Sequence, residues 1–177
     1  LFSTLKTKKE IYFYSFLSFL VWNLSTTFWI MHASMLGMIL AVLVNTFLMS
    51  FVFLLAFIVK KKFDLKRGWW AILCFWLSFE YIHLNWDLSW PWLTLGNSFA
   101  TYPKFIQWYE YTGVLGGSLW ILTVNLFVTQ AINNKKYRYS SLFVLLVPIA
   151  VSFFLNSNIE KSHSQKFVLV QPNIDPY

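Results

Sequence analysis

The stretch "MLGMILAVLVNTFLMSFVFLLAFIV", residues 35–59, decides the fold class, because it contains no charged side chain. A helix needs about 20 mostly apolar residues to cross the hydrocarbon layer of a bilayer. Backbone groups cannot stay unpaired in lipid, so the stretch must be helical despite its β-branched and aromatic residues. It therefore predicts a transmembrane helix.

Four further apolar runs flank this one. They cover Ile11–His32, Trp69–Trp86, Gly113–Ile132 and Ser140–Asn156. The second and fourth of these are short and would cross with little tilt. Only 12% of the chain is charged and 58% is hydrophobic, whereas a soluble domain is about 25% charged. The predicted fold class is an all-α integral membrane bundle of about five transmembrane helices, spanning residues 1–160.

The net charge of +7 would suit a nucleic-acid-binding protein, but the basic residues lie in short clusters between apolar runs. Eleven of the 14 lysines and arginines fall on one side of the predicted bundle; the other side holds Lys104, Lys161 and Lys166. Basic loops stay in the cytoplasm. The N-terminus is therefore expected inside the cell and the C-terminus outside, with no nucleic-acid partner.

The segment between the third and fourth runs, His83–Gly113, is rich in Trp and Tyr. Such rings rest at the headgroup level of a membrane. Pro91 would break a helix, and Gly96–Asn97 favours a turn. We expect a re-entrant or interfacial loop beside the bundle.

Glu80 lies well inside the third run. A carboxylate there is costly and usually faces protein or a water-filled cavity. It is expected either to anchor a loop or lipid headgroup, or to be a protonated or hydrogen-bonded structural glutamate near the outer boundary. His83 is a candidate partner, because residues three apart share one helix face, although such a histidine is more often merely interfacial.

Other polar residues carry weaker signals. Asp87 and Glu110 bracket the aromatic segment as a possible acid/base pair or as two separate solvated acids. Asn23 and Asn45 are expected to hydrogen-bond between helices. The histidines show no metal-ligand spacing and Cys74 is the single cysteine, so no metal, cofactor or catalytic constellation is predicted in this chain.

The chain ends on "KFVLVQPNIDPY", Lys166–Tyr177. Four apolar residues from Phe167 to Val170 precede a Gln-Pro-Asn turn signal. This pattern predicts a short buried β-strand, unlike anything before it. Residues 161–177 are therefore expected to begin a second, truncated domain.

Three stretches together resemble the bacterial apolipoprotein N-acyltransferases: "FEYIHLNWDLSWPWLTLGNSF" (79–99), "YTGVLGGSLWILTVNLFV" (111–128) and "FVLVQPNID" (167–175). The family has an acidic residue in a span, then a Pro-Trp-Leu element and a Gly, a Gly-rich span, and a strand of this form. The stretch Val21–Ile30 is similar to the family's third span. The matching positions here are Glu80, Pro91 to Leu93, Gly96, Gly113 to Gly117, and Val168 to Ile174. Where the family often has an Arg after the Glu, this chain has His83.

The resemblance implies that the terminal strand opens a nitrilase-like α/β domain on the outer side, with a Glu-Lys-Cys triad. Its cysteine would take an acyl chain from a phospholipid and pass it to the diacylglyceryl-cysteine of an apolipoprotein. The triad lies outside these 177 residues, as would two spans before Ile11 and one after the nitrilase-like domain. It also implies a monomer in the bacterial inner membrane, without a cofactor, whose partners are the phospholipid donor, the apolipoprotein acceptor and membrane lipids.

The residues expected to contact lipid are Trp90, Trp92, Gly96 and Asn97, next to Pro91, with Glu80 supporting the loop. Two alternatives stay open. A small transporter would use Glu80 and the glycines as a pathway, but it predicts inverted repeats, which the sequence does not show. A non-catalytic membrane scaffold would resemble the enzyme without its triad.

Overall fold

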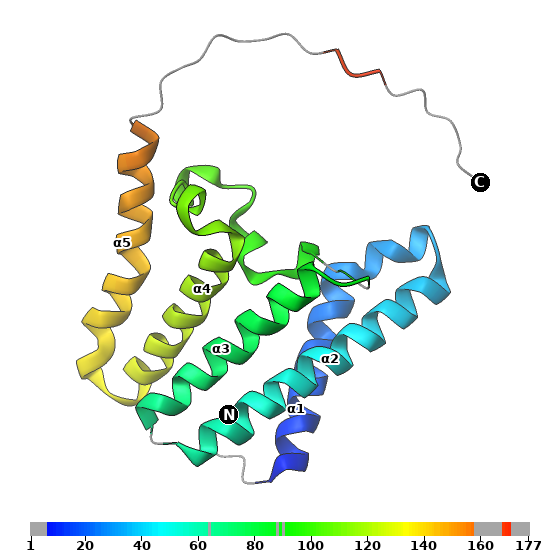
Figure 1. Ribbon diagram of the computed structural model, residues 1–177, viewed down its shortest axis with the longest axis horizontal. Coiled ribbons are helices and arrows are strands. Elements are labelled where there is room, and N and C mark those ends of the chain that lie inside the picture. Colours follow the sequence, from blue (N-terminus) through cyan, green and yellow to red (C-terminus); the bar gives the residue numbers. More distant parts are fainter. Residues whose placement is uncertain (1–6, 64, 88, 90, 158–167, 171–177) are drawn as a thin grey trace.

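The computed structural model describes residues 7–63, 65–87, 89, 91–157 and 168–170. In these residues the chain forms five α-helices that run alternately up and down (Figure 1), and they coincide with the five predicted apolar runs. The helices are α1 (Lys8–Thr27), α2 (Met35–Lys62), α3 (Leu65–Leu84), α4 (Tyr109–Asn133) and α5 (Arg138–Ser157). Short 3-10 helices join them: η1 (Phe28–His32), η2 (Pro91–Leu93), η3 (Leu95–Phe99), η4 (Pro103–Phe105) and η5 (Lys135–Tyr137).

Local sequence fixes where the first two helices begin. Thr7 and Glu10 form a capping box at the start of α1, which satisfies two backbone donors that a helix start leaves free. At the start of α2, the Ser34 hydroxyl accepts a hydrogen bond from the Gly37 backbone N–H at 3.0 Å. The short η1 between them folds α1 and α2 into an antiparallel pair.

Three segments are long and apolar enough to cross a membrane: α2, residues Tyr109–Ile132 of α4, and Lys135–Leu155 around α5. The described residues thus support an all-helical membrane bundle. The predicted crossings by the first and third runs do not meet the same test of length and composition, although α1 and α3 are helical.

The interior of the bundle contains many small and polar side chains beside apolar ones, and its surface is apolar. The fully buried side chains, each less than 2% exposed, are Ile11, Ser15, Asn23, Thr27, Thr46, Ser50, Ser118 and Ser152. Large apolar side chains such as Leu36, Phe143 and Phe154 are more than half exposed. This inversion suits lipid as the solvent, because small and polar residues at helix interfaces hold membrane helices together.

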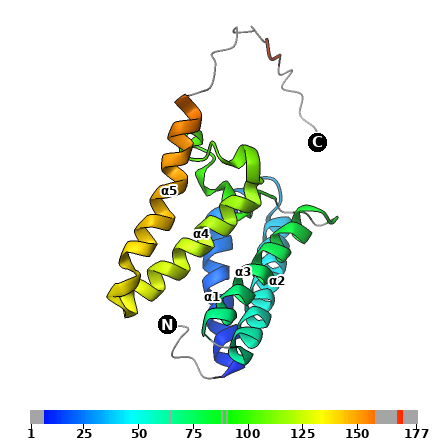
Figure 2. The same ribbon diagram turned by 60° about the vertical axis from the view of Figure 1, so that its left-hand side comes forward.

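The basic clusters gather at one end of the bundle. Figures 1 and 2 show the start of α1, the α2–α3 connection and the α4–α5 connection at that end, and η1 with the loop after α3 at the other. Lys60–Lys62 end α2 and Lys135–Lys136 precede α5. The fold therefore brings together the charges on which the predicted orientation rests.

The fourth helix begins earlier than predicted. The sequence placed its start at Gly113, whereas α4 begins at Tyr109 and bends at Gly113, which has φ 65° and ψ −173°. A side chain strains that backbone conformation, and glycine does not. Gly113 thus marks a break within the helix and not its first residue.

The predicted terminal strand is not seen. Val168, Leu169 and Val170 are exposed and belong to no strand, and the rest of the segment lies outside the described residues. A strand needs a neighbour with which to exchange backbone hydrogen bonds. The described part of the chain offers none.

Candidate functional site

The loop that joins α3 to α4, residues 85–108, is called the aromatic loop below. It covers one end of the bundle through η2, η3 and η4, with η3 packed on α4 and η4 on α5. Its backbone donors are paired by short-range bonds, for example from Asn97 N to Thr94 O at 3.0 Å and from Tyr102 N to Phe99 O at 2.8 Å. Backbone paired in this way is tolerated at the edge of a membrane, since few groups need water.

Glu80 holds the start of η3 against α3. Its side chain is 4% exposed, and its Oε1 accepts hydrogen bonds from Leu95 N at 2.9 Å and from Trp76 Nε1 at 3.0 Å. Glu80 therefore has the geometry of a loop anchor, with Trp76 fixing its orientation from one helical turn away.

Gly96 is the point at which the loop touches α4. Its N–H donates to Ser118 Oγ at 2.9 Å, and its carbonyl accepts from Tyr109 Oη at 3.0 Å. A Cβ at this position would collide with the backbone carbonyl of Val114. Only glycine allows the backbone of η3 to approach the helix so closely.

A groove of about 350 Å³ runs between the aromatic loop and the end of α1. Trp92 and Asn97 line it from the loop, and Trp22, Thr26 and Trp29 line it from the opposite side. Trp92 is 48% exposed, and its ring lies 6.3 Å from that of Trp29. The groove offers aromatic surface to an apolar chain.

The remaining predicted loop residues are Pro91, Asn97 and Trp90. Asn97 Nδ2 donates to Pro91 O at 2.7 Å, so this pair closes the turn that carries Trp92. Trp90 lies outside the described residues.

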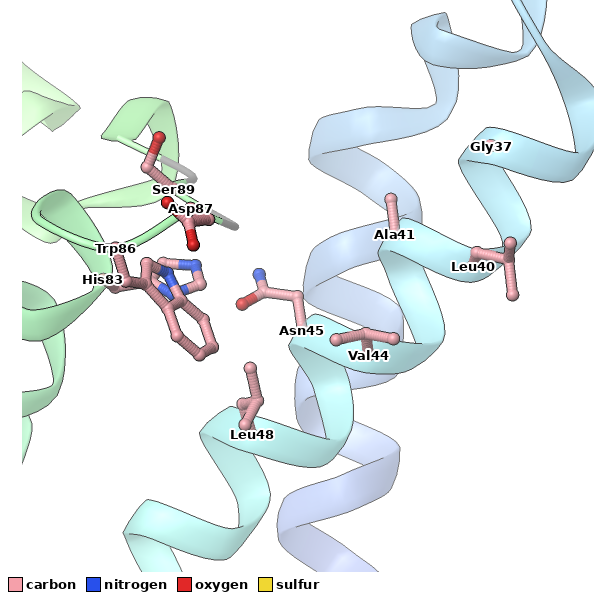
Figure 3. Close-up of a pocket in the computed structure, with 10 residues that line it drawn as sticks. All are labelled: Gly37, Leu40, Ala41, Val44, Asn45, Leu48, His83, Trp86, Asp87 and Ser89. Atoms are coloured by element: carbon pink, nitrogen blue, oxygen red, sulfur yellow. The ribbon is translucent and has the colours of Figure 1, made fainter.

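A second cavity, of about 400 Å³, lies between α2 and the end of α3 (Figure 3). Its α2 wall is mostly apolar, with Leu40, Val44 and Leu48, while His83 and Asp87 stand on the other side. This volume is in the range of small-molecule pockets. Asp87 and Glu110 are both exposed, and no hydrogen bond joins them among the described residues, so the pattern fits two separate acids.

The pairing of Glu80 with His83, one of the two expectations for this histidine, is not made among the described residues. The His83 ring instead stacks on Phe79 at 5.0 Å and lies against Trp86 at 5.3 Å, because three aromatic side chains follow one another along this face. The expected interhelical bond is confirmed: Asn45 Nδ2 donates to Asn23 Oδ1 at 2.7 Å.

Sequence reasoning missed Trp76, Tyr109, Ser118 and Ser152. The spacing of Trp76 and Glu80, four residues apart on one helix, could have indicated their contact. Ser152 Oγ reaches the carbonyl of Phe105, 47 residues away, at 2.7 Å, and no local signal predicts such a pairing. Within the described ranges, no three His, Cys, Asp or Glu side chains gather to hold a metal ion.

Comparison with known proteins identifies the family of this chain. Residues 1–127 match the family model described as "Apolipoprotein N-acyltransferase N-terminal domain". A curated apolipoprotein N-acyltransferase of Chlorobaculum tepidum is 30% identical over 173 residues, which cover 92% of this chain and 32% of that protein. The chain thus spans about a third of the relative's length, and no solved structure matches it. With most of its length covered by the family model, the chain belongs to the apolipoprotein N-acyltransferase N-terminal domain family.

Proposed function

We propose that this chain is the membrane part of an enzyme that transfers an acyl chain from a phospholipid to the N-terminal diacylglyceryl-cysteine of apolipoproteins. Family membership supports the reaction class. The observation that carries the role of this chain is the Glu80–Leu95 hydrogen bond, because it fixes the aromatic loop beside a groove lined with Trp side chains.

The proposed location is the bacterial inner membrane, with the basic end of the bundle in the cytoplasm. The gathering of Lys60–Lys62 and Lys135–Lys136 at one end supports this orientation, since positive loops are retained inside. The aromatic loop and the end of α5 then face the periplasm. Both substrates present their lipid headgroups at that surface.

Trp92 is the residue proposed to contact an acyl chain. It stands half-exposed in the groove, and an aromatic ring offers a large apolar surface to a methylene chain. An indirect role is proposed for Glu80, Gly96 and the Asn97–Pro91 pair, which would hold η2 and η3 in place. They position the loop and do not touch reacting atoms.

The bond-making step is assigned to a nitrilase-like domain that residues 161–177 would begin. By resemblance, its cysteine accepts the acyl chain as a thioester and then yields it to the α-amino group of the acceptor. No residue of this chain is given a catalytic role. The bundle would contribute by holding lipid beside the catalytic domain. Reactants held in place react as if in one molecule, without the entropy cost of a chance encounter in the membrane.

The two alternatives gain no specific support. For a transporter, Glu80 would need to line a pathway, whereas its Oε1 is bonded to Trp76 and to the loop backbone. A scaffold without catalysis would share the loop and the groove, so activity must separate it from the enzyme.

The test uses the full-length protein that contains this chain, with phospholipid vesicles and a diacylglyceryl-cysteine peptide. Trp92→Ala should lower kcat/KM about tenfold, which corresponds to ~1.4 kcal/mol, and Trp92→Phe should retain most of the activity. Trp70→Ala is the matched control, because Trp70 is 66% exposed near the start of α3, at the opposite end of the bundle. Equal rates and lipid affinities for Trp92→Ala and wild type would refute the contact. An inactive wild-type protein would favour the scaffold.

A further inference from the structure

Three side chains at the centre of the bundle carry polar atoms without a hydrogen-bond partner among the described residues. The atoms are Asn45 Oδ1, Glu80 Oε2 and both ring nitrogens of His83. The side chains are only 3%, 4% and 8% exposed. Buried polar groups are almost always paired, and leaving one unpaired is costly. Such a cluster indicates a polar ligand.

The same three residues line one small chamber. It has a volume of about 10 Å³, and its other walls include Met49, Phe79 and Thr94. A buried water needs roughly 10–15 Å³ and two to four polar partners. The chamber therefore fits a single water and is too small for an acyl chain or a headgroup.

The neighbouring cavity gives this chamber a connection to the surface. Asn45 and His83 line both spaces, and Figure 3 shows the His83 ring and the Asn45 amide facing each other across the gap between α3 and α2. Asp87 and Ser89, at the same cavity, are exposed. Water can thus reach the chamber from the end of the bundle that carries the aromatic loop.

We propose that one ordered water occupies this chamber and bridges Asn45, Glu80 and His83. The donors and acceptors balance. With Glu80 as a carboxylate, Asn45 Oδ1 and Glu80 Oε2 both accept, so they cannot bond to each other, but they can take the two hydrogens of a water. A ring N–H of His83 donates to the water oxygen, which gives three bonds, the usual number for a buried water.

The bridge joins Asn45 on α2 to Glu80 on α3, between which the described residues show no direct hydrogen bond. Asn45 is bonded to Asn23 on α1 at 2.7 Å, and Glu80 to Leu95 N in the aromatic loop at 2.9 Å. A chain of hydrogen bonds therefore runs from α1 through α2 and the water to α3 and the loop. The water bridge does not depend on the proposed acyl transfer. It is tested by the density of an ordered water and by melting temperatures, and neither measurement involves activity.

The first measurement is a structure of the full-length protein, at a resolution that shows ordered waters. We expect a density peak within hydrogen-bond distance of Asn45 Oδ1, Glu80 Oε2 and one His83 ring nitrogen. A chamber that is empty, closed by direct side-chain contact or filled by lipid would overturn the proposal.

The second measurement is a double-mutant cycle on melting temperature. His83→Phe, which keeps an aromatic ring on Phe79, should lower Tm by roughly 2–4 °C. Asn45→Leu should lower it further, because this variant also removes the bond to Asn23. Their combination should cost clearly less than the sum, because both variants remove the same water. Val44→Ala, which lines only the larger cavity, should add fully to His83→Phe. An additive Asn45–His83 pair would contradict the bridge.

Discussion

Replacing Glu80 by Leu should release the aromatic loop from the bundle. The variant keeps an apolar side chain of similar length in the third helix and removes the acceptor of Leu95 N and of Trp76 Nε1. A buried donor left without a partner costs about 1–3 kcal/mol. Leu95 N belongs to the loop, whereas Trp76 lies on α3 together with Glu80, so only the bond from Leu95 resists opening. Its loss should weaken the closed loop by about 1–3 kcal/mol.

Trypsin cleavage at Lys104 measures this opening. Lys104 is the one basic residue of the aromatic loop and is exposed, between η4 residues that pack on α5. When opening and closing are fast, the cleavage rate follows the population of the open form. Even the lower bound of ~1 kcal/mol corresponds to about a fivefold faster cleavage.

Ser78→Ala is the control, since Ser78 lies two residues away on the same helix but is exposed. It should leave cleavage at Lys104 unchanged. Glu80→Gln should fall between the two, because its amide oxygen can still accept while the charge is lost. If Glu80→Leu were cleaved no faster than Ser78→Ala, the loop would not depend on Glu80 and the assignment would be wrong.

Two further substitutions test the packing that surrounds this anchor. Gly96→Ala would push a methyl group into the carbonyl of Val114 and should cost about 1–3 kcal/mol, seen as a lower Tm of the full-length protein in detergent; an unchanged Tm would mean that η3 does not touch α4. Asn23→Ala removes the bond to Asn45 and should cost ~0.5–2 kcal/mol, measured by the same melting experiment with exposed Ser18→Ala as control; a variant as stable as this control would argue against the α1–α2 polar contact.

Much of the helical framework follows from the sequence, because a single segment in lipid can pair all its backbone N–H and C=O groups only by forming a helix. Residues 35–59 had to be helical once they were assigned to a membrane, and α2 covers them entirely. The Asn23–Asn45 bond was predictable for a related reason, since amide side chains inside a bundle need partners. The burial of Glu80 was also predictable, because a carboxyl group that faces lipid is costly in free energy and therefore faces protein or water.

The partner of Glu80 was not predictable, because it depends on the path of an irregular loop. Leu95 is 15 residues further along the chain, and its N–H reaches Glu80 only after η2 and the turn at Asn97 have formed. The fit of Gly96 against α4 likewise depends on the bend at Gly113. Sequence patterns report periodicity and breaks, whereas these contacts arise from tertiary packing.

Of the two expectations for His83, the pairing with Glu80 is not made, for an energetic reason. Helical spacing put His83 on the same face as Glu80, but Phe79 and Trp86 provide ring surface on both sides of the imidazole. Stacking fixes the ring while Glu80 turns its Oε1 toward Trp76 and Leu95. Shared helix faces therefore indicate proximity but do not determine which polar atoms pair.

The central claim is that the aromatic loop and the end of α5 face the outside of the cytoplasmic membrane, where acyl donor and acceptor meet. A pair of reporters fused after Tyr177 tests this most directly, one active only in the periplasm and the other only in the cytosol. We predict activity from the periplasmic reporter and silence from the cytosolic one. The reverse pattern would contradict the orientation, and with it the proposed role of the loop.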